Sequence, residues 1–577
     1  MCELNANMSV RTLFLFLGLS CLSAVGCMKR DTSQIPSRDS RGVLGFEDVS
    51  LKSGITFKHQ NSNTTNKYLI ETMGSGGAAV DLNNDGWIDL VFVNNRTLPG
   101  GASVTAPSVA VYQNQHGAFI DRTPHSGLEQ TKIYGMGISA ADFDKDGLID
   151  LYVTSVLDGS RLFKNLGGFR FKDVTAKAGV GNKGSWGTSS TWVDMDKDGD
   201  LDLFVCNYVN YATLADDQPC FSGDENKRIY CIPSAYDGSM CRLYKNNDNG
   251  TFTDVSVAAG LSVSKGKSLG LAVWDVDRDG YEDIFVANDT TPGFLFMNNR
   301  NGTFKEVGVE AGVAYNESGI PHSGMGIDAQ DLDHNGSTSL LITNYFGQET
   351  NLYHQVGDVL FQDERLQRGV AGPTNHYVGF GVGFVDLDND GALDVFQTNG
   401  HVQDEIQERE PNASFKQQPV ILRNMGRGLF TEVTADGITL LKEKRVGRGV
   451  VLVDFDNDGK QDVVLTNNND SVKVWKNTTA KVGHFIGISL ASKQTTDTVI
   501  GTEITLVDGD RKQRFLVRTG SGYLTQNDMR IHIGLGNKAT AVLQLKWPNG
   551  TQEVFSVSKV DAYVTLKQGT GTRVSGH

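Results

Sequence analysis

Seven short acidic loops carry the residues of this sequence that could do chemistry. Each follows the spacing Asp-x-Asp/Asn-x-Asp/Asn-Gly-x-x-Asp, with one degraded copy, and each runs directly into an apolar segment. Carboxylates at alternate positions of a short loop converge on one point, and a hard divalent cation relieves their repulsion. Calcium, which takes about six to eight oxygen ligands, fits such a loop. The glycine at the sixth position allows the positive φ that turns the loop back on itself.

The predicted calcium ligands are the side chains at the first, third, fifth and ninth positions of the loops. They are Asp81, Asn83, Asp85 and Asp89; Asp142, Asp144, Asp146 and Asp150; Asp194, Asp196, Asp198 and Asp202; Asp275, Asp277, Asp279 and Asp283; Asp331, Asp333 and Asn335; Asp386, Asp388, Asp390 and Asp394; and Asp454, Asp456, Asp458 and Asp462. The fifth loop has Ser339 at its ninth position, so we expect it to bind metal weakly or not at all. The alternative for any loop is a solvated turn that favours Asp and Gly.

The loops are not EF-hands. An EF-hand needs a bidentate Glu at its twelfth position and flanking helices, whereas the second loop has Val153 there, inside an apolar strand-like run. We therefore expect each loop to be a hairpin connection between two strands, and up to seven calcium ions with the fifth site doubtful.

Each acidic loop is one part of a longer repeated unit. The loops begin at intervals of 52 to 81 residues. A Gly-rich apolar strand precedes each loop, a second strand follows it, a third often ends in Asn, and a fourth begins with Phe-x-Asp/Glu. Four short strands joined by tight turns are typical of a propeller blade. The small residues of the first strand suit the innermost position, where the blades crowd around the axis.

The sequence also predicts how the ring closes. A Phe-x-Asp element at Phe46 precedes the first loop, and the last unit lacks one. We expect residues near 46–50 to supply the outer strand of the last blade, which removes free sheet edges. The predicted fold is all-β: a seven-bladed β-propeller over residues 46–480, followed by a small β-sandwich over 481–570. Asp508-Gly509 and Asn549-Gly550 are hairpin turn signals in that second part.

The N-terminus predicts export. Arg11 precedes an apolar run that is too short for a permanent membrane span and ends in small residues. The run closes on Ala24-Val25-Gly26-Cys27, which resembles a lipoprotein cleavage site. We predict a signal peptide over residues 1–27, lipidation of Cys27 and a polar tether over 28–45; plain cleavage without lipid is the alternative. The protein would then lie in the cell envelope or be secreted.

Four cysteines fall within a 36-residue stretch. We expect two disulfides, Cys220–Cys231 closing an insertion loop and Cys206–Cys241 at its base. A zinc site is the alternative, but the stretch has no CxxC pair and no His.

Charge and length restrict the partners and the architecture. The formal net charge of −15 argues against nucleic acid or an anionic membrane surface as a partner, so membrane contact is expected only through an N-terminal lipid. At 577 residues the chain is too long for a single hydrophobic core, so we expect two or more domains, or a repeat domain with an additional one.

Three motifs near the C-terminus carry a family resemblance: Gly520–Gln526 (GSGYLTQ), His532–Gly536 (HIGLG) and Trp547–Gly550 (WPNG). Their order resembles the ASPIC/UnbV domain, and the acidic units resemble the FG-GAP/VCBS repeats also seen in integrin α-subunit heads. The combination is similar to the cartilage acidic protein family and its exported bacterial relatives. The insertion and Asn399–Val402 also look like that family. The resemblance implies extracellular placement and calcium binding, with no established reaction or ligand.

The leading functional hypothesis is an exported, calcium-stabilised binding or adhesion module for an extracellular protein or glycan. The sequence has no GxSxG, HExxH or phosphate-binding glycine loop. Six residues that precede innermost strands are expected to lie on one axial face, either as a ligand site or as ordinary loop residues: Tyr134, Trp186, Lys267, His322, His376 and Arg445. A propeller enzyme, such as a polysaccharide lyase or hydrolase using that face, and a scaffold subunit of a surface complex are the alternatives.

Overall fold

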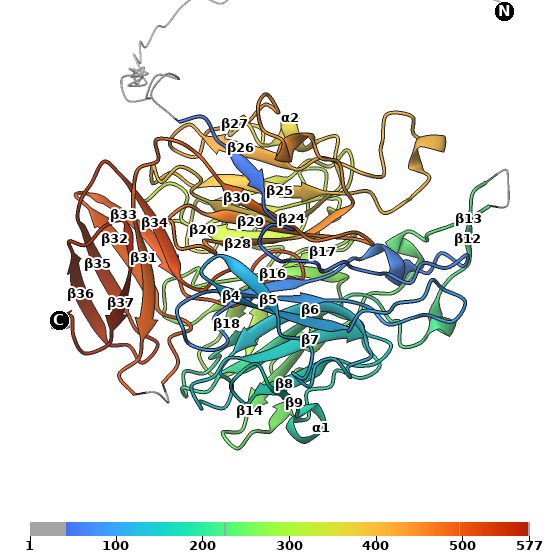
Figure 1. Ribbon diagram of the computed structural model, residues 1–577, viewed down its shortest axis with the longest axis horizontal. Helices are drawn as coiled ribbons and strands as arrows, with labels where there is room; N and C mark the ends of the chain where they lie inside the picture. Colours follow the sequence, from blue (N-terminus) through green and yellow to red (C-terminus); the bar gives the residue numbers. More distant parts are fainter. Residues whose placement is uncertain (1–41, 224–226, 495–496, 575–577) are drawn as a thin grey trace, which may run out of the picture.

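The computed structural model describes residues 42–223, 227–494 and 497–574. The predicted signal peptide, Cys27 and most of the predicted tether lie outside these residues. Figure 1 shows a body of β-sheets, with the C-terminal strands packed on one side and the β12–β13 hairpin projecting from the opposite side.

Seven four-stranded antiparallel sheets form the body, and each acidic loop joins the first strand of a sheet to its second. In chain order the sheets contain β2 (Gly77–Val80), β3 (Asp89–Val93), β4 (Val109–Gln115) and β5 (Ala118–Asp121); β6 (Tyr134–Ala141), β7 (Asp150–Val156), β8 (Arg161–Asn165) and β9 (Phe171–Asp173); β10 (Gly187–Val193), β11 (Asp202–Asn207), β14 (Arg242–Asn246) and β15 (Phe252–Asp254); β16 (Ser268–Trp274), β17 (Asp283–Asn288), β18 (Phe294–Asn298) and β19 (Phe304–Glu306); β20 (Ile327–Gln330), β21 (Ser339–Ile342), β22 (Asn351–Gln355) and β23 (Phe361–Asp363); β24 (Gly379–Val385), β25 (Asp394–Asn399), β26 (Val420–Asn424) and β27 (Phe430–Glu432); and β28 (Gly447–Val453), β29 (Asp462–Asn467), β30 (Lys473–Asn477) and β1 (Phe46–Asp48).

The first strands of these sheets contact one another in a closed ring, in the order β2, β6, β10, β16, β20, β24, β28 and back to β2. Strand β1 pairs with β30, with Phe46 opposite Asn477. The predicted propeller and its closing strand are thereby confirmed. The innermost strands approach closely: a Cβ atom on Gly326 would lie 2.0 Å from the carbonyl oxygen of Phe380 in the next sheet. Small residues are required there for this reason.

The remaining elements of the body are short. They are α1 (Thr175–Ala178), α2 (Ala371–Thr374), the 3-10 helices η1 (Leu69–Thr72), η2 (Leu214–Asp216), η3 (Pro233–Ala235), η4 (Leu261–Val263), η5 (Ile406–Glu408) and η6 (Leu440–Lys442), and the hairpin β12 (Cys220–Phe221) and β13 (Arg228–Ile229). The hairpin lies in the cysteine insertion between β11 and β14, at the end of the propeller axis that faces away from the C-terminal strands (Figure 1).

The C-terminal strands, residues 484–573, form two sheets and are called here the C-terminal module. One sheet has the order β34-β31-β37 and the other β33-β32-β35-β36-β38. The strands are β31 (His484–Ala491), β32 (Glu503–Asp508), β33 (Arg511–Leu516), β34 (Ile531–Gly536), β35 (Ala541–Lys546), β36 (Gln552–Val557), β37 (Ala562–Lys567) and β38 (Thr572–Arg573). Side chains from both sheets, including Ile486 and Leu543, pack into one core. The predicted sandwich is confirmed, with turns at Gly509 and Gly550, both at positive φ.

The C-terminal module does not stand apart from the propeller. The connection between β33 and β34, residues 517–530, enters the middle of the ring, and we call it the axial plug. The Gln526 backbone N–H donates to Gly77 O at 3.0 Å, and the Gly522 N–H donates to Ile327 O at 2.6 Å. The Gln526 side chain accepts from Ala140 N at 2.7 Å. The GSGYLTQ motif therefore fills the axis and hydrogen-bonds to inner strands of several sheets.

Candidate metal loops and axial pocket

The acidic loops share one backbone turn. In the second loop the carboxylate of Asp142 accepts from the N–H of Gly147 at 2.8 Å and from that of Asp146 at 3.1 Å. Gly147 has a φ of 87°, and Lys145, at the fourth position, has a φ of 59°. Sequence reasoning found the left-handed glycine but missed the left-handed fourth position.

The ninth-position Asp connects the loop to the rest of the sheet. Asp150 accepts from the N–H of Asn165, at the end of the third strand, at 2.7 Å. The Asn165 side chain then donates to Leu82 O, in the loop of the preceding sheet, at 2.9 Å. An Asn in the same place contacts the ninth-position Asp in five further sheets, as Asn114, Asn246, Asn298, Asn424 and Asn477. The Asn that ends the third strand is therefore a link between neighbouring blades.

Five loops bring three carboxylates together so that their oxygen atoms lie within 4.8 Å of one another. The groups are Asp142, Asp144 and Asp146; Asp194, Asp196 and Asp202; Asp275, Asp277 and Asp279; Asp386, Asp388 and Asp390; and Asp454, Asp456 and Asp462. Several of these oxygens are buried and have no hydrogen-bond partner: Oδ1 of Asp144, Asp194, Asp196 and Asp456. A buried anionic oxygen without a partner is costly, so these loops fit a cation.

Burial dominates the electrostatics of the loops. It raises the pKa of Asp150 and of Asp202 to about 8, against the opposing effect of their backbone hydrogen bonds. Burial likewise raises the pKa of Asp194 to about 7. Carboxylates in this state release their protons readily only when a positive charge joins them.

Basic side chains on third strands and in nearby turns already approach several loops. Lys164 forms ion pairs with Asp144 and with Asp146, the second at 2.9 Å. Further pairs are Lys245 with Asp196 and Asp198, Lys476 with Asp456 and Asp458, Lys460 with Asp458, Arg423 with Asp388, and Arg300 with Asp279. The second and third loops each have one paired lysine against four carboxylates, and the seventh has two, so all three loops keep a net negative charge.

The first and fifth loops differ from the other five. In the first loop Asn83 replaces a carboxylate, and its side-chain amide donates to Asp85 at 2.8 Å. In the fifth loop Arg368 holds Asp333 through two hydrogen bonds of 2.7 and 2.8 Å. Burial would raise the pKa of Asp333, but the bonds from Arg368 outweigh it and lower the pKa. The negative charge of Asp333 in the fifth loop is thus balanced by Arg368 of the protein itself.

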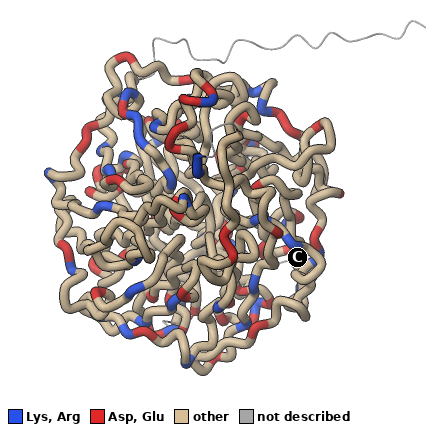
Figure 2. Tube along the Cα trace, turned by 90° about the vertical axis from the view of Figure 1, so that its right-hand side faces the viewer, with Lys and Arg blue, Asp and Glu red and all other residues tan. Residues whose placement is uncertain are grey.

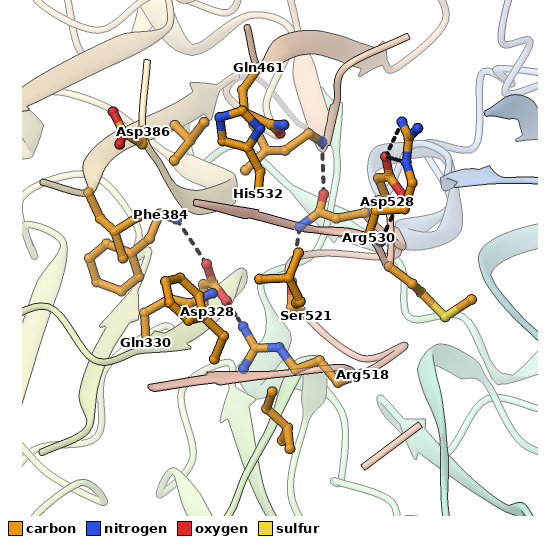
Figure 3. A pocket seen from close by; sticks show the side chains of 18 of the residues that line it. Asp328, Gln330, Phe384, Asp386, Gln461, Arg518, Ser521, Asp528, Arg530 and His532 are labelled. Carbon is orange, nitrogen blue, oxygen red and sulfur yellow. Dashed lines mark hydrogen bonds and ion pairs between the residues drawn. The ribbon is translucent and has the colours of Figure 1, made fainter. Parts of the chain in front are cut away.

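The C-terminal module covers the fourth to seventh loops. Asp331 accepts from the Arg514 backbone N–H at 3.0 Å, and Asp454 accepts from the Tyr563 hydroxyl at 2.9 Å. Figure 3 shows the polar cavity at this interface, of about 110 Å³, where Arg518 pairs with Asp328 at 2.5 Å and Arg530 faces Asp528. The propeller and the module are therefore joined by the hydrogen bonds of Arg514 and Tyr563 to the loops, and by the axial plug, which adds the buried ion pair of Arg518 with Asp328.

The opposite end of the axis holds a second cavity, of about 240 Å³, which we call the axial pocket. Its lining comes from η1, from the ends of inner strands, from the insertion and from the segment after β25: Leu69, Thr72, Met73, Tyr208, Tyr230–Ser234, Leu269, Asp289, Thr290, Ser323, Met325, Tyr345, Phe380, Val402 and Gln403. The tip of the plug supports the floor, since the Tyr523 hydroxyl donates to Met73 O at 2.9 Å. Figure 2 views the molecule from this side and shows acidic and basic residues interspersed.

The six residues predicted for the axial face have different environments. Tyr134 and Trp186 are fully buried beneath it, in the same cluster as the pocket walls. Lys267 is buried, His322 and Arg445 are half-buried, and His376 is exposed. None of the six lines the axial pocket. The residues that do line it, such as Asp289 and Met325, were missed because they are spread over separate blades and share no motif.

The cysteines match the prediction in part. Cys220 and Cys231 form a disulfide within the insertion. Cys206 and Cys241 are buried free thiols that hydrogen-bond to each other, so the predicted second bridge is wrong for this structure. The pairing of β11 with β14 brings them together, with Val205 opposite Arg242. This pairing already fixes the base of the insertion.

Two family models match the chain. The FG-GAP-like repeat matches residues 81–153, 142–205 and 275–342, and ASPIC and UnbV matches residues 492–573. The chain carries FG-GAP-like repeats and an ASPIC and UnbV region. The ASPIC and UnbV match includes the axial plug, so the resemblance drawn from the GSGYLTQ motif is confirmed.

Individual proteins are similar over much of the chain. Cartilage acidic protein 1 of Mus musculus is 26% identical over 540 residues, which are 85% of this chain and 73% of that protein. The Homo sapiens protein of the same name is 27% identical over 466 residues, 74% of this chain and 62% of its own. Among solved structures, the BP39L lectin of Burkholderia pseudomallei aligns with a TM-score of 0.40 at 10% identity, covering 70% of this chain and 96% of the lectin. No helix in the described part of the chain has the length and apolar character to cross a bilayer.

Proposed function

We propose that this protein is an exported β-propeller that is stabilised by calcium and binds an extracellular ligand at its axial pocket. The observation that carries the calcium part is the set of buried carboxylate oxygens without partners in the second, third and seventh loops. Side chains at the first, third, fifth and ninth positions would hold the ion, with a backbone carbonyl as an additional ligand. The ion would supply positive charge and fix the loop.

The position of the loops supports a structural role for the ion. The ninth-position Asp of each such loop also holds the Asn that links two blades, as Asp150 holds Asn165. Neutralising the loop therefore stabilises the contact between blades. The fourth to seventh loops also lie under the C-terminal module, whose plug supports the floor of the axial pocket. Calcium would thus help to keep the pocket in its binding shape.

Export is supported by the disulfide between Cys220 and Cys231, which persists in oxidising compartments. Together with the predicted signal peptide, it favours an envelope or secreted location and an extracellular ligand. The axial pocket favours a binding role because it is concave and mainly apolar, with a few polar groups, as small-ligand sites are.

Calcium titration by calorimetry tests the proposal. We expect several moles of calcium to bind per mole of protein, and the melting temperature to rise with calcium concentration as binding to the folded state requires. Asp194→Asn in the third loop should remove one site. The matched change Asp331→Asn in the fifth loop should leave the stoichiometry unchanged. The proposal would be contradicted if the protein bound no calcium, or if its melting temperature did not change with calcium concentration.

A further inference from the structure

The axial pocket combines an apolar wall with one carboxylate. Leu69, Met73, Leu269, Met325 and Phe380 line it and are all buried. Of the described residues that line it, only Asp289 carries a charged side chain. Its volume of about 240 Å³ exceeds the cavity of about 150 Å³ that takes up benzene in another protein. The pocket therefore suits a group the size of an amino-acid side chain.

Neutral donors, not a salt bridge, surround Asp289. The Tyr208 hydroxyl donates to its carboxylate at 2.7 Å, and the Ser323 hydroxyl also bonds to it. Lys267 acts on it only at longer range, and the Lys267 ammonium lies 3.4 Å from the hydroxyl of Thr290. No ion pair within 4.0 Å involves Asp289 among the described residues. Burial raises the pKa of Asp289 to about 6, so the carboxylate is largely ionised at neutral pH.

We propose that the axial pocket binds an alkylammonium group, with the ammonium at Asp289 and the carbon chain against Met73 and Met325. This inference rests on the proposed function of the axial face. A buried carboxylate that lines a pocket with aromatic rings and has no ion-pair partner favours a cation. A sugar is disfavoured, because most of its hydroxyls would face apolar walls without hydrogen bonds. An anion would be repelled by Asp289.

The rim of the pocket is fixed before any ligand arrives. The Tyr230 hydroxyl donates to the buried Glu71 at 3.1 Å, and the Gln403 side chain donates to Tyr230 O at 2.7 Å. The disulfide of Cys231 adds a covalent constraint. Ordering a binding site in advance lowers the entropic cost of binding. Exposed rim residues, Ile232 at 63% and Ser234, leave the mouth open to solvent.

Calorimetric titration of the calcium-loaded protein with n-hexylamine, n-hexanol and n-hexanoate tests the proposal. We expect hexylamine to bind at least tenfold more tightly than hexanol, and hexanoate not to bind. Asp289→Asn should weaken hexylamine at least tenfold and leave hexanol unchanged. The control Asp237→Asn changes an exposed acid of the same face and should leave both affinities unchanged. If Asp289→Asn fails to fold, Ser234→Trp at the exposed rim should block hexylamine instead.

Several results would overturn the proposal. Equal affinities for the amine and the alcohol would mean that the pocket recognises apolar surface alone. Failure of every probe to bind, while calcium still raises the melting temperature, would remove the pocket assignment and leave the calcium role intact. Absence of any calcium effect would instead refute the proposed function. A second titration with a short lysine-containing peptide and its acetyl-lysine counterpart distinguishes a side chain on a partner from a free amine: tighter binding of the lysine peptide than of hexylamine indicates a protein ligand.

Discussion

The second and fifth loops have the same turn but different charges. The Gly N–H at the sixth position donates to the first Asp in both, at 2.8 Å in the second loop and 2.9 Å in the fifth. The second loop has four carboxylates and one nearby lysine, Lys164. The fifth has two carboxylates, and Arg368 binds one of them through both guanidinium NH₂ groups. The turn therefore needs only the carboxylate of the first Asp and the backbone N–H groups that it accepts from, and it does not depend on the number of further acids.

This difference indicates what the extra acids do. The fifth loop shows that two carboxylates suffice for the turn. The other two carboxylates of the second loop therefore add electrostatic repulsion, which destabilises the fold unless an ion binds. In the fifth loop an arginine takes the place of that ion. Its ninth position is Ser339, and Gln355 replaces the linking Asn, donating to Val276 O of the preceding sheet at 3.0 Å. The blade contact is kept without the acid.

Removing calcium should have the largest effect on stability. It should empty the second loop and the other acid-rich loops at the same time, and it should leave the fifth loop unchanged. At a calcium concentration one hundred times Kd, each occupied site adds about 2.7 kcal/mol to stability. Loss of several sites should lower the melting temperature by more than about 10 °C. Differential scanning calorimetry with calcium and with EDTA measures this. Restoring calcium should restore the transition, and an unchanged melting temperature would mean that the acids are solvated turns.

Arg368→Met should cost about 3 kcal/mol, because it leaves Asp333 partly buried with only His354, at 3.6 Å, as a basic partner within 4.0 Å in the described part of the chain. The loss should be equal with and without calcium, in contrast to changes in the second loop. Urea unfolding in both conditions measures it. Lys52→Met is the control: the Lys52 and Glu47 side chains are 77% and 51% exposed, and an exposed ion pair contributes little. A loss at Arg368 that appears only with calcium would show that the fifth loop holds an ion after all.

Giving the fifth loop a third carboxylate should create a calcium site. The triple variant Ser339→Asp, Gln355→Asn and Arg368→Ala restores the ninth-position acid and the linking Asn and removes the competing guanidinium. We expect calorimetry to find one additional calcium per chain, with about 2.7 kcal/mol of added stability at one hundred times Kd. The variant with Gln355→Asn alone should gain no site. An unchanged stoichiometry in the triple variant would mean that carboxylate count does not decide binding.

The features that could be predicted from the sequence are those that depend on the spacing of residues close together in the chain. The Asp spacing located the loops between the first and second strands, and the lone Phe46 element predicted the closing strand. The role of Gly520–Gln526 as an axial plug could not be predicted, because its partners are inner strands of separate blades that its own sequence does not identify. The pocket around Asp289 and Met325 was missed for the same reason. Arg368 was also missed, since it reaches the loop from the turn after β23.

Lys164→Met should have the smallest effect and bears on the second loop alone. Lys164 contacts Asp144 and Asp146, so its ammonium competes with an incoming ion for the same oxygens. Met297, on the third strand of the fourth sheet, has the equivalent place beside the fourth loop. Removing a partly exposed pair of this kind is worth about 0.2 to 1 kcal/mol, so calcium affinity at that loop should rise about 1.4- to fivefold by calorimetric titration. The control is Lys172→Met. Lys172 lies on the paired outer strand and is exposed, so this change should leave the calcium affinity unchanged. A fall in affinity with Lys164→Met would mean that the lysine helps to shape the site and does not compete for it.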